Sequence, residues 1–241
     1  MGYDKTEKKA SCVQDGVVNE SSTFAVLMRN VYVWMTCGIL MTALTAMIVG
    51  RNENWLHALA TSGMYWGLLI AEVAMVIALS AFIRKLSFTA AGLMFAAYAI
   101  LNGATISFIM AIYTAESIAQ AFFVTAGTFG GMSLVGFFTK KDLSTMGRAL
   151  IMALIGLIIA TVVNIFWHNT LFTAALNYLG VIIFVGLTAY DTQKIKTMLT
   201  QAQYYGLNDD TNKLALMGSL ELYLDFVNLF LYILRIFGRR K

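Results

Sequence analysis

The sequence contains no proline, little charge, and few residues suited to thiol or metal chemistry. Without proline, no helix loses a backbone N–H donor in its interior. The only cysteines, Cys12 and Cys37, form no CxxC pair and have no histidines nearby, which argues against a disulfide or a metal site. Charged residues make up 12% of the chain, against about 25% in an average soluble domain. This share is too small to cover a water-facing particle.

Long apolar runs take the place of that charge, and 59% of the residues are hydrophobic. Uncharged segments cover 30–50, 86–115, 117–139 and 149–190. One membrane crossing needs about 20 apolar residues in helical conformation. The last run is therefore long enough for two crossings, and the polar break at 167–170 is the natural place to divide it.

These runs predict an all-α fold, a polytopic bundle of seven transmembrane helices. Its expected spans are 31–49, 63–83, 88–113, 117–138, 147–167, 171–196 and 214–237. Residues 1–30 are expected to form a polar cytoplasmic tail, and residues 31–238 the transmembrane domain. The first six spans pair into three hairpins, and the seventh is unusually polar. We therefore expect the last helix to lie at the centre of the bundle.

The orientation is predicted from the lysines and arginines, which are enriched in cytoplasmic loops of membrane proteins. Most of the 17 fall on the side of the N-terminus. The other side holds Arg51 and the basic C-terminal tail, with Arg235 at the end of the last span. A cytoplasmic N-terminus fits this distribution, with the tail as the one feature that disagrees. The net charge of +4 thus reflects membrane flanks, and no nucleic-acid partner is expected.

The seventh span carries polar residues on one face. These fall at spacings of i, i+4, i+7, i+11 and i+14, namely Glu221, Asp225, Asn228, Tyr232 and Arg235. We expect Glu221, Asn228, Tyr232 and Arg235 to line a pore or ion pathway. An ionisable side chain at the centre of a membrane helix costs about 2.5–3.5 kcal/mol on insertion scales and usually faces the protein interior. Glu221 and Arg235 are near enough to the span ends to reach the interface. Asp225 is not, and we expect a functional role for it.

Asp191, at the end of the sixth span, is expected to meet Asp225. The two spans form an antiparallel hairpin, and residue 208 lies midway between the two aspartates, so they should sit at the same depth. Two carboxylates held close together in a poorly solvated place do not both ionise readily. They are expected to titrate as a pair, sharing a proton when closed and separating when charged. This arrangement predicts a proton-sensitive gate.

Two further charged residues belong to the second span. Glu72 lies in its middle and is expected to line a pore or to be paired. Arg84 ends the span; it is either a positive cytoplasmic flank or an alternative partner of Asp191.

Weaker features concern helix packing. Gly127 and Gly131 form a GxxxG pattern, which permits close helix contact. Tyr98, Asn102 and Thr105 share one face of the third span, as interhelical hydrogen bonds require.

Two motifs resemble those of the Bax inhibitor family (transmembrane Bax inhibitor motif proteins), which has bacterial members. They are Gly-Leu-Thr-Ala-Tyr-Asp-Thr-Gln at 186–193 and Leu-Tyr-Leu-Asp-Phe-Val-Asn-Leu-Phe at 222–230. The resemblance extends over roughly residues 25–238. It implies a seven-helix fold with a central last helix, placed in the bacterial cytoplasmic membrane. It also implies a pH-sensitive calcium leak with a sensor at Asp191 and Asp225, an arginine partner at Arg84, and a second-span acid at Glu72.

The leading hypothesis is therefore a calcium leak channel gated by protonation, with calcium as the transported ion and no cofactor. Acidic oxygens are hard ligands suited to calcium, although no metal site is assigned. A proton-coupled calcium exchanger is the second hypothesis, which the lack of an inverted repeat disfavours. A non-transporting regulator of a membrane partner, such as a protease, is the third. An enzyme is not expected, because the chain has no GxSxG, no HExxH and no histidine within a span.

Overall fold

The computed structural model describes residues 3–83, 85–167, 169–202 and 208–241, with side chains for all of these except residues 3–22 and 60. This part of the chain is helical almost throughout. In chain order the helices are α1 (Tyr3–Gly50), α2 (Glu53–Thr61), α3 (Met64–Phe82), α4 (Phe88–Ile106), α5 (Ile109–Ile112), α6 (Ala115–Phe138), α7 (Ser144–Trp167), α8 (Thr170–Ala202) and α9 (Asp209–Phe237).

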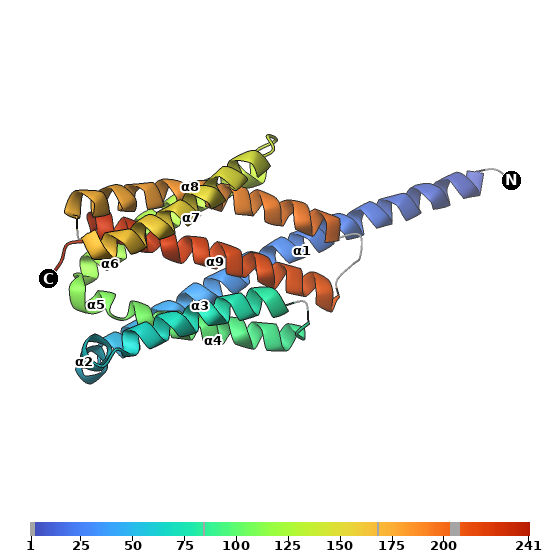
Figure 1. The fold of residues 1–241 in the computed structure, drawn as a ribbon. Coiled ribbons are helices and arrows are strands. Elements are labelled where there is room, and N and C mark those ends of the chain that lie inside the picture. Colours follow the sequence, from blue (N-terminus) through green and yellow to red (C-terminus); the bar gives the residue numbers. More distant parts are fainter. Residues whose placement is uncertain (1–2, 84, 168, 203–207) are drawn as a thin grey trace.

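Seven of the described helical segments are long and apolar enough to cross a membrane, which confirms the predicted fold class. They are α1 from residue 23, α3, the joined α4 and α5, α6, α7, α8 and α9. The two chain ends lie at opposite ends of the bundle (Figure 1), as an odd number of crossings requires. The division of the chain at residue 30 into a tail and a domain stays a prediction. Leu27 and Met28 already belong to the packed core.

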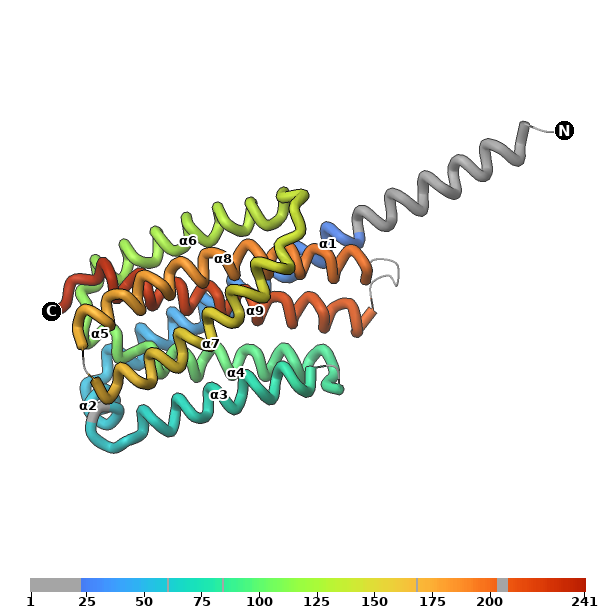
Figure 2. The backbone as a smooth tube through the Cα atoms, turned by 45° about the horizontal axis from the view of Figure 1, so that its top comes forward, coloured from blue at the N-terminus to red at the C-terminus, as the bar shows by residue number. Residues whose placement is uncertain are grey.

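The last helix, α9, is the central element, as the sequence predicted. It packs against α1, α4, α6 and α8, and Figure 2 shows it running between the α6–α8 side and the α3–α4 side of the bundle. In its most apolar stretch 61% of the residues are buried, against 6% for α7. The outer face of α7 carries exposed side chains such as Ile158 and Ile159. Apolar residues of this kind are suited to lipid, so the hydrophobic pattern alone does not distinguish core from periphery.

The helices of the last hairpin are longer than expected. The polar segment 197–213 was predicted to be a connection, but α8 continues to Ala202 and α9 begins at Asp209. The 33 residues of α8 span about 50 Å, which exceeds the hydrocarbon thickness of about 30 Å. Polar residues can therefore continue the helix into water. Asn208 starts α9 with a capping box, in which its side chain accepts from the Thr211 N–H and Thr211 Oγ1 accepts from the Asn208 N–H.

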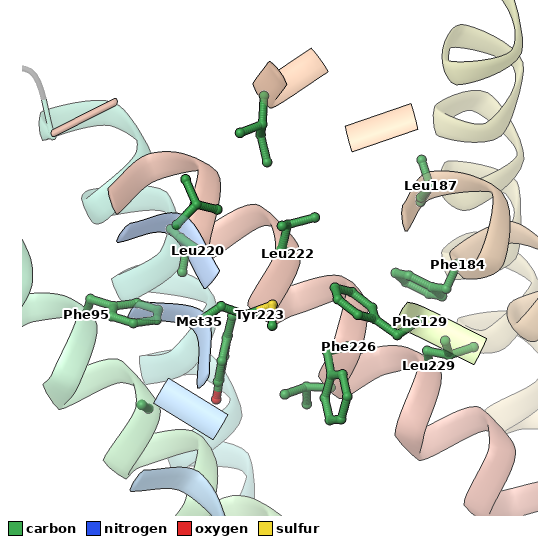
Figure 3. Packing of buried hydrophobic residues seen from close by; sticks show 14 of the residues in the cluster. Met35, Phe95, Phe129, Phe184, Leu187, Leu220, Leu222, Tyr223, Phe226 and Leu229 are labelled. Carbon is green, nitrogen blue, oxygen red and sulfur yellow. The ribbon is translucent and has the colours of Figure 1, made fainter. Parts of the chain in front are cut away.

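Aromatic side chains fill the core on two sides of α9. On the α1–α4 side, the Tyr223 ring packs edge-to-face against Phe95 and Tyr98, with centroid separations of 5.5 and 5.8 Å. On the α6–α8 side, Phe226 packs against Phe129 at 5.5 Å. Figure 3 shows Tyr223 directed toward Phe95, and Phe226 on the side of Phe129. Residues three apart on α9 thus contact different neighbours.

The chain ends in an extended tail that returns to the bundle. The Thr114 N–H donates to the Arg239 carbonyl at 3.1 Å, and the Lys241 N–H donates to the Ile112 carbonyl at 2.9 Å. The Arg239 N–H also donates to Ser117 Oγ at 2.9 Å. The tail therefore ties the end of α9 to the connection between α5 and α6.

Candidate functional site in the α8–α9 hairpin

The hairpin of α8 and α9 brings Asp191 and Asp225 together. The two carboxyl groups lie close enough to interact with each other, so they lie level, as the symmetry of the hairpin predicts. Asp225 is 4% exposed and Asp191 is half-buried. Protein therefore covers the Asp225 side chain almost completely and the Asp191 side chain in part. Their role as a pH sensor stays a prediction.

Close packing against α6 fixes the position of α8 at this depth. Gly136 lies so near the Ala189 carbonyl that a Cβ atom has no room there. Next to it, the buried hydroxyls of Thr188 and Thr192 donate back to the carbonyls one turn earlier, each at 2.7 Å. Small and internally satisfied side chains therefore allow α8 to approach α6 around Asp191.

The contact between the two aspartates has a definite chemical requirement. An ionised carboxylate has no hydrogen to donate, so two of them can form a hydrogen bond only when one carries a proton. The second oxygen of Asp225, Oδ2, is buried and has no hydrogen-bond partner among the described residues. Full ionisation would leave two negative charges in contact within a poorly solvated core, which favours their separation.

An ion pair lies one helical turn from the aspartates. Lys194 Nζ and Glu221 Oε1 are 2.7 Å apart, and the two side chains are 42% and 22% exposed. Lys194 also interacts electrostatically with both aspartates. We call Asp191, Asp225, Lys194 and Glu221 the aspartate cluster.

Lys194 was missed as a site residue because it was counted only as a positive flank. The hairpin symmetry contains a signal that could have found it. Lys194 and Glu221 are nearly equidistant from residue 208, as Asp191 and Asp225 are.

The remaining polar residues of the α9 stripe face α8 or their own helix. The Tyr232 ring stacks on Phe184 of α8 at 5.8 Å. The Arg235 guanidinium lies over the Tyr232 ring at 5.4 Å, and Asn228 donates to the Leu224 carbonyl at 2.8 Å. The stripe is therefore covered by protein for much of its length. Whether these residues line an ion pathway stays a prediction.

Glu72 belongs to a separate polar group on the other side of α9. Asn102 Nδ2 donates to Glu72 Oε2 at 3.5 Å, and Asn102 Oδ1 accepts from the Tyr223 hydroxyl at 3.1 Å. The Tyr223 hydroxyl also contacts Thr42 Oγ1 at 2.6 Å. We call Glu72, Asn102, Tyr223 and Thr42 the tyrosine cluster. Asn102 does form the interhelical hydrogen bonds that the pattern on the third span predicted.

Arg84, the predicted alternative partner of Asp191, lies outside the described residues. Within the described part of the chain, no group of three or more His, Cys, Asp or Glu side chains is arranged to hold a metal ion. The acids of the aspartate cluster are accompanied by Lys194, which contributes an opposing positive charge.

Comparison with known proteins gives one consistent family. The family described as "Inhibitor of apoptosis-promoting Bax1" matches residues 25–241. The inner membrane protein YbhL of Escherichia coli strain K12 is 46% identical over 230 residues, covering 94% of this chain and 97% of YbhL. An uncharacterized protein of Deinococcus radiodurans is 36% identical over 237 residues, covering 98% and 99% of the two chains. The chain therefore belongs to the Bax inhibitor family of multi-pass membrane proteins.

Proposed function

We propose that this protein is a pH-sensitive calcium leak channel of the bacterial inner membrane, gated by Asp191 and Asp225. The observation that carries the proposal is the close approach of the buried Asp225 carboxyl group and the half-buried Asp191 carboxyl group. In the closed state the pair shares a proton. When the proton leaves, repulsion between the two carboxylates drives α8 and α9 apart and opens a path.

The proposed orientation follows the distribution of positive charge. The end of the bundle that holds the N-terminus also holds the connections α3–α4 and α6–α7 (Figure 1). These carry Lys85, Lys140 and Lys141. We place this end in the cytoplasm, so a rise of cytoplasmic pH opens the channel.

Calcium is the proposed ion because the side chains that become charged on opening are carboxylates. Calcium prefers hard oxygen ligands, and Asp and Glu supply them. Asp191, Asp225 and Glu221 approach each other in the aspartate cluster, and Glu72 contributes a further acid on the other side of α9. Calcium crosses as the transported ion, and the protein holds no resident cofactor.

Calcium flux into liposomes that contain the purified protein tests the proposal. The wild-type leak should rise as pH increases, whereas Asp225→Asn should lose this response because the amide cannot ionise. The idea is wrong if Asp225→Asn leaves both the flux and its pH dependence unchanged. A saturable flux that requires a counter-transported proton gradient indicates an exchanger, and the absence of any flux favours a non-transporting regulator.

Asp142→Asn is the matched control. Asp142 is an exposed carboxyl between α6 and α7, outside the spans. Hydrogen bonds from the Ser144 hydroxyl and backbone N–H hold the pKa of Asp142 below its usual range. This group therefore stays ionised throughout the neutral range, and its replacement should leave the pH curve of the leak in place.

A further inference from the structure

The two clusters use opposite sides of one helix. Tyr223 and Asp225 are two positions apart on α9, which separates their side chains by roughly 200° around the helix axis. Tyr223 points toward α1 and α4 (Figure 3), where it contacts Phe95 and Thr42. Asp225 contacts Asp191 on α8. Because α9 is a continuous helix here, a movement of Asp225 away from α8 also moves Tyr223.

The tyrosine cluster joins α9 to three other helices through buried hydrogen bonds. Tyr223 is fully buried, and its hydroxyl reaches Thr42 of α1 and Asn102 of α4. Asn102 continues the chain to Glu72 of α3. Thr42 Oγ1 also donates to the Ala99 carbonyl at 2.9 Å, which fixes α1 against α4.

Breaking such a network exposes unpaired polar groups to a poorly solvated environment, which makes its loss costly.

We propose that the tyrosine cluster is an interlock that positions α9 so that Asp225 meets Asp191, and that Tyr223 is its central positioning residue. The interlock rests on the proposed function in one respect, since the state that it stabilises is the closed channel. Opening separates α9 from α8, so it presses the fully buried Tyr223 side chain toward α1 and α4 and distorts its hydrogen bonds to Thr42 and Asn102. The tyrosine cluster thus sets how much charge repulsion between the aspartates is needed before the gate opens.

The groups that surround both clusters allow a definite expectation. Among the described residues, the titratable side chains that face Tyr223 are Glu72 from α3 and Tyr98 from α4. The aspartates are faced by Lys194 from α8 and Glu221 from α9. None of these charged groups is changed when the Tyr223 hydroxyl is removed. A shift in the pH response of such a variant must therefore come from the position of α9.

The test compares Tyr223→Phe with Tyr98→Phe. Both substitutions remove one hydroxyl from a buried ring of the same aromatic group, but the Tyr98 hydroxyl makes no hydrogen bond to the described residues, whereas that of Tyr223 makes two. We expect Tyr223→Phe to raise the leak at the pH where wild type is closed, by about three- to tenfold for each of the two hydrogen bonds that opening distorts. Its half-maximal pH should move down. Tyr98→Phe should follow the wild-type curve.

Thr42 supplies an independent variant if Tyr223→Phe folds poorly. Thr42→Val removes the hydroxyl that contacts Tyr223 and should shift the curve in the same direction, whereas Thr42→Ser keeps that hydroxyl and should restore wild-type behaviour. A merely structural role for Thr42 predicts instead that both changes lower stability and leave the half-maximal pH in place.

A second readout separates failure of the interlock from failure of the channel. The infrared band of the protonated carboxyl pair reports ionisation of Asp191 and Asp225 without any flux, and it should titrate at lower pH in Tyr223→Phe. If this band and the leak both match wild type, the interlock is wrong. If the band shifts but no variant conducts calcium, the interlock stands and the proposed function falls.

Discussion

The two sides of α9 solve the problem of buried polar groups in different ways. On the α8 side, the aspartate cluster concentrates charge, and the lysine of its ion pair is 42% exposed. On the α1–α4 side, the tyrosine cluster connects a hydroxyl, a phenol and an amide by hydrogen bonds, with Glu72 as its one acidic member. A charged cluster that reaches solvent can exchange protons. A buried neutral network keeps the same state over a wide pH range and maintains geometry.

This contrast indicates a division of labour within one helix. In our proposal Asp225 loses its proton as pH rises, and Tyr223 stabilises the closed position of α9 against the resulting repulsion. The difference is sharpest in their immediate partners, since Asp225 faces another acid and Tyr223 faces a hydroxyl and an amide. The following changes test whether the two sides are as distinct as their chemistry suggests.

The largest effect is expected from the aspartates themselves. Asp191→Asn should abolish the pH response of the leak as completely as Asp225→Asn, because either change removes one of two groups that share a proton. The double variant should add nothing to either single change. Liposome flux over a pH series measures all three. Two independent shifts that add in the double variant would contradict a shared site.

Glycine substitutions on each side should give the next largest effect. Gly136→Ala forces a Cβ against the Ala189 carbonyl beside Asp191, and Gly103→Ala forces one against Thr42 of the tyrosine cluster. Each should destabilise the protein by about 1–3 kcal/mol through overpacking, measured as a lower melting temperature in detergent.

Gly127→Ala is the control for both glycine variants, since nothing in the described residues lies within 4 Å of a Cβ at that position. It should melt at the wild-type temperature or slightly above it, because alanine has a higher helix propensity than glycine. Equal destabilisation by all three changes would show that close contact does not determine the effect.

Changes in the ion pair should have smaller effects of opposite sign. The positive charge of Lys194 favours ionised aspartates, so Lys194→Met should move the half-maximal pH of the leak upward. Glu221→Gln removes a negative charge and should move it downward. Partly exposed pairs contribute about 0.2–1 kcal/mol, which corresponds to a few tenths of a pH unit. Shifts in the same direction would rule out a direct electrostatic effect on the aspartates.

The smallest effect on the pH response of the leak is expected at the far end of α9. Ser117→Ala removes the side-chain acceptor of the Arg239 N–H, and the loss of one such hydrogen bond costs about 0.5–1.5 kcal/mol. The melting temperature should fall slightly, while the pH curve of the leak stays in place. A shift of that curve would show that the C-terminal tail also acts on the gate. The aspartate cluster and the tyrosine cluster would then not be the only contacts of α9 that control it.

Much of the architecture could be predicted from the sequence because lipid imposes strict conditions on it. Uncharged runs such as 149–190 can only be membrane crossings, and the polar stripe through Asp225 requires a protein environment. The seven crossings and the central position of α9 follow from these two facts. The helix ends at Ala202 and Asp209 did not follow, since helices that leave the membrane no longer need apolar residues.

Which residues contact a neighbouring helix was harder to predict from the sequence than where each helix lies along the chain. Gly127 and Gly131 were expected to bring helices together, but a Cβ at either position meets nothing in the described residues, whereas Gly136 makes the closest approach. All three are glycines of one helix, and which of them faces α8 depends on how α6 is rotated in the bundle. The sequence of a single helix does not contain that rotation.

The sequence by itself determined which groups could not face lipid, because the energetic cost of a charge in hydrocarbon is a property of the residue and its depth. It also set Asp191 and Asp225 at one level, since a hairpin has a fixed rise per residue. Only the tertiary structure decided which side of α9 each group occupies, and so placed Lys194 beside the aspartates and Glu72 with Tyr223. Those pairings arise from the packing of α1, α4, α6 and α8 around α9, which no local pattern encodes.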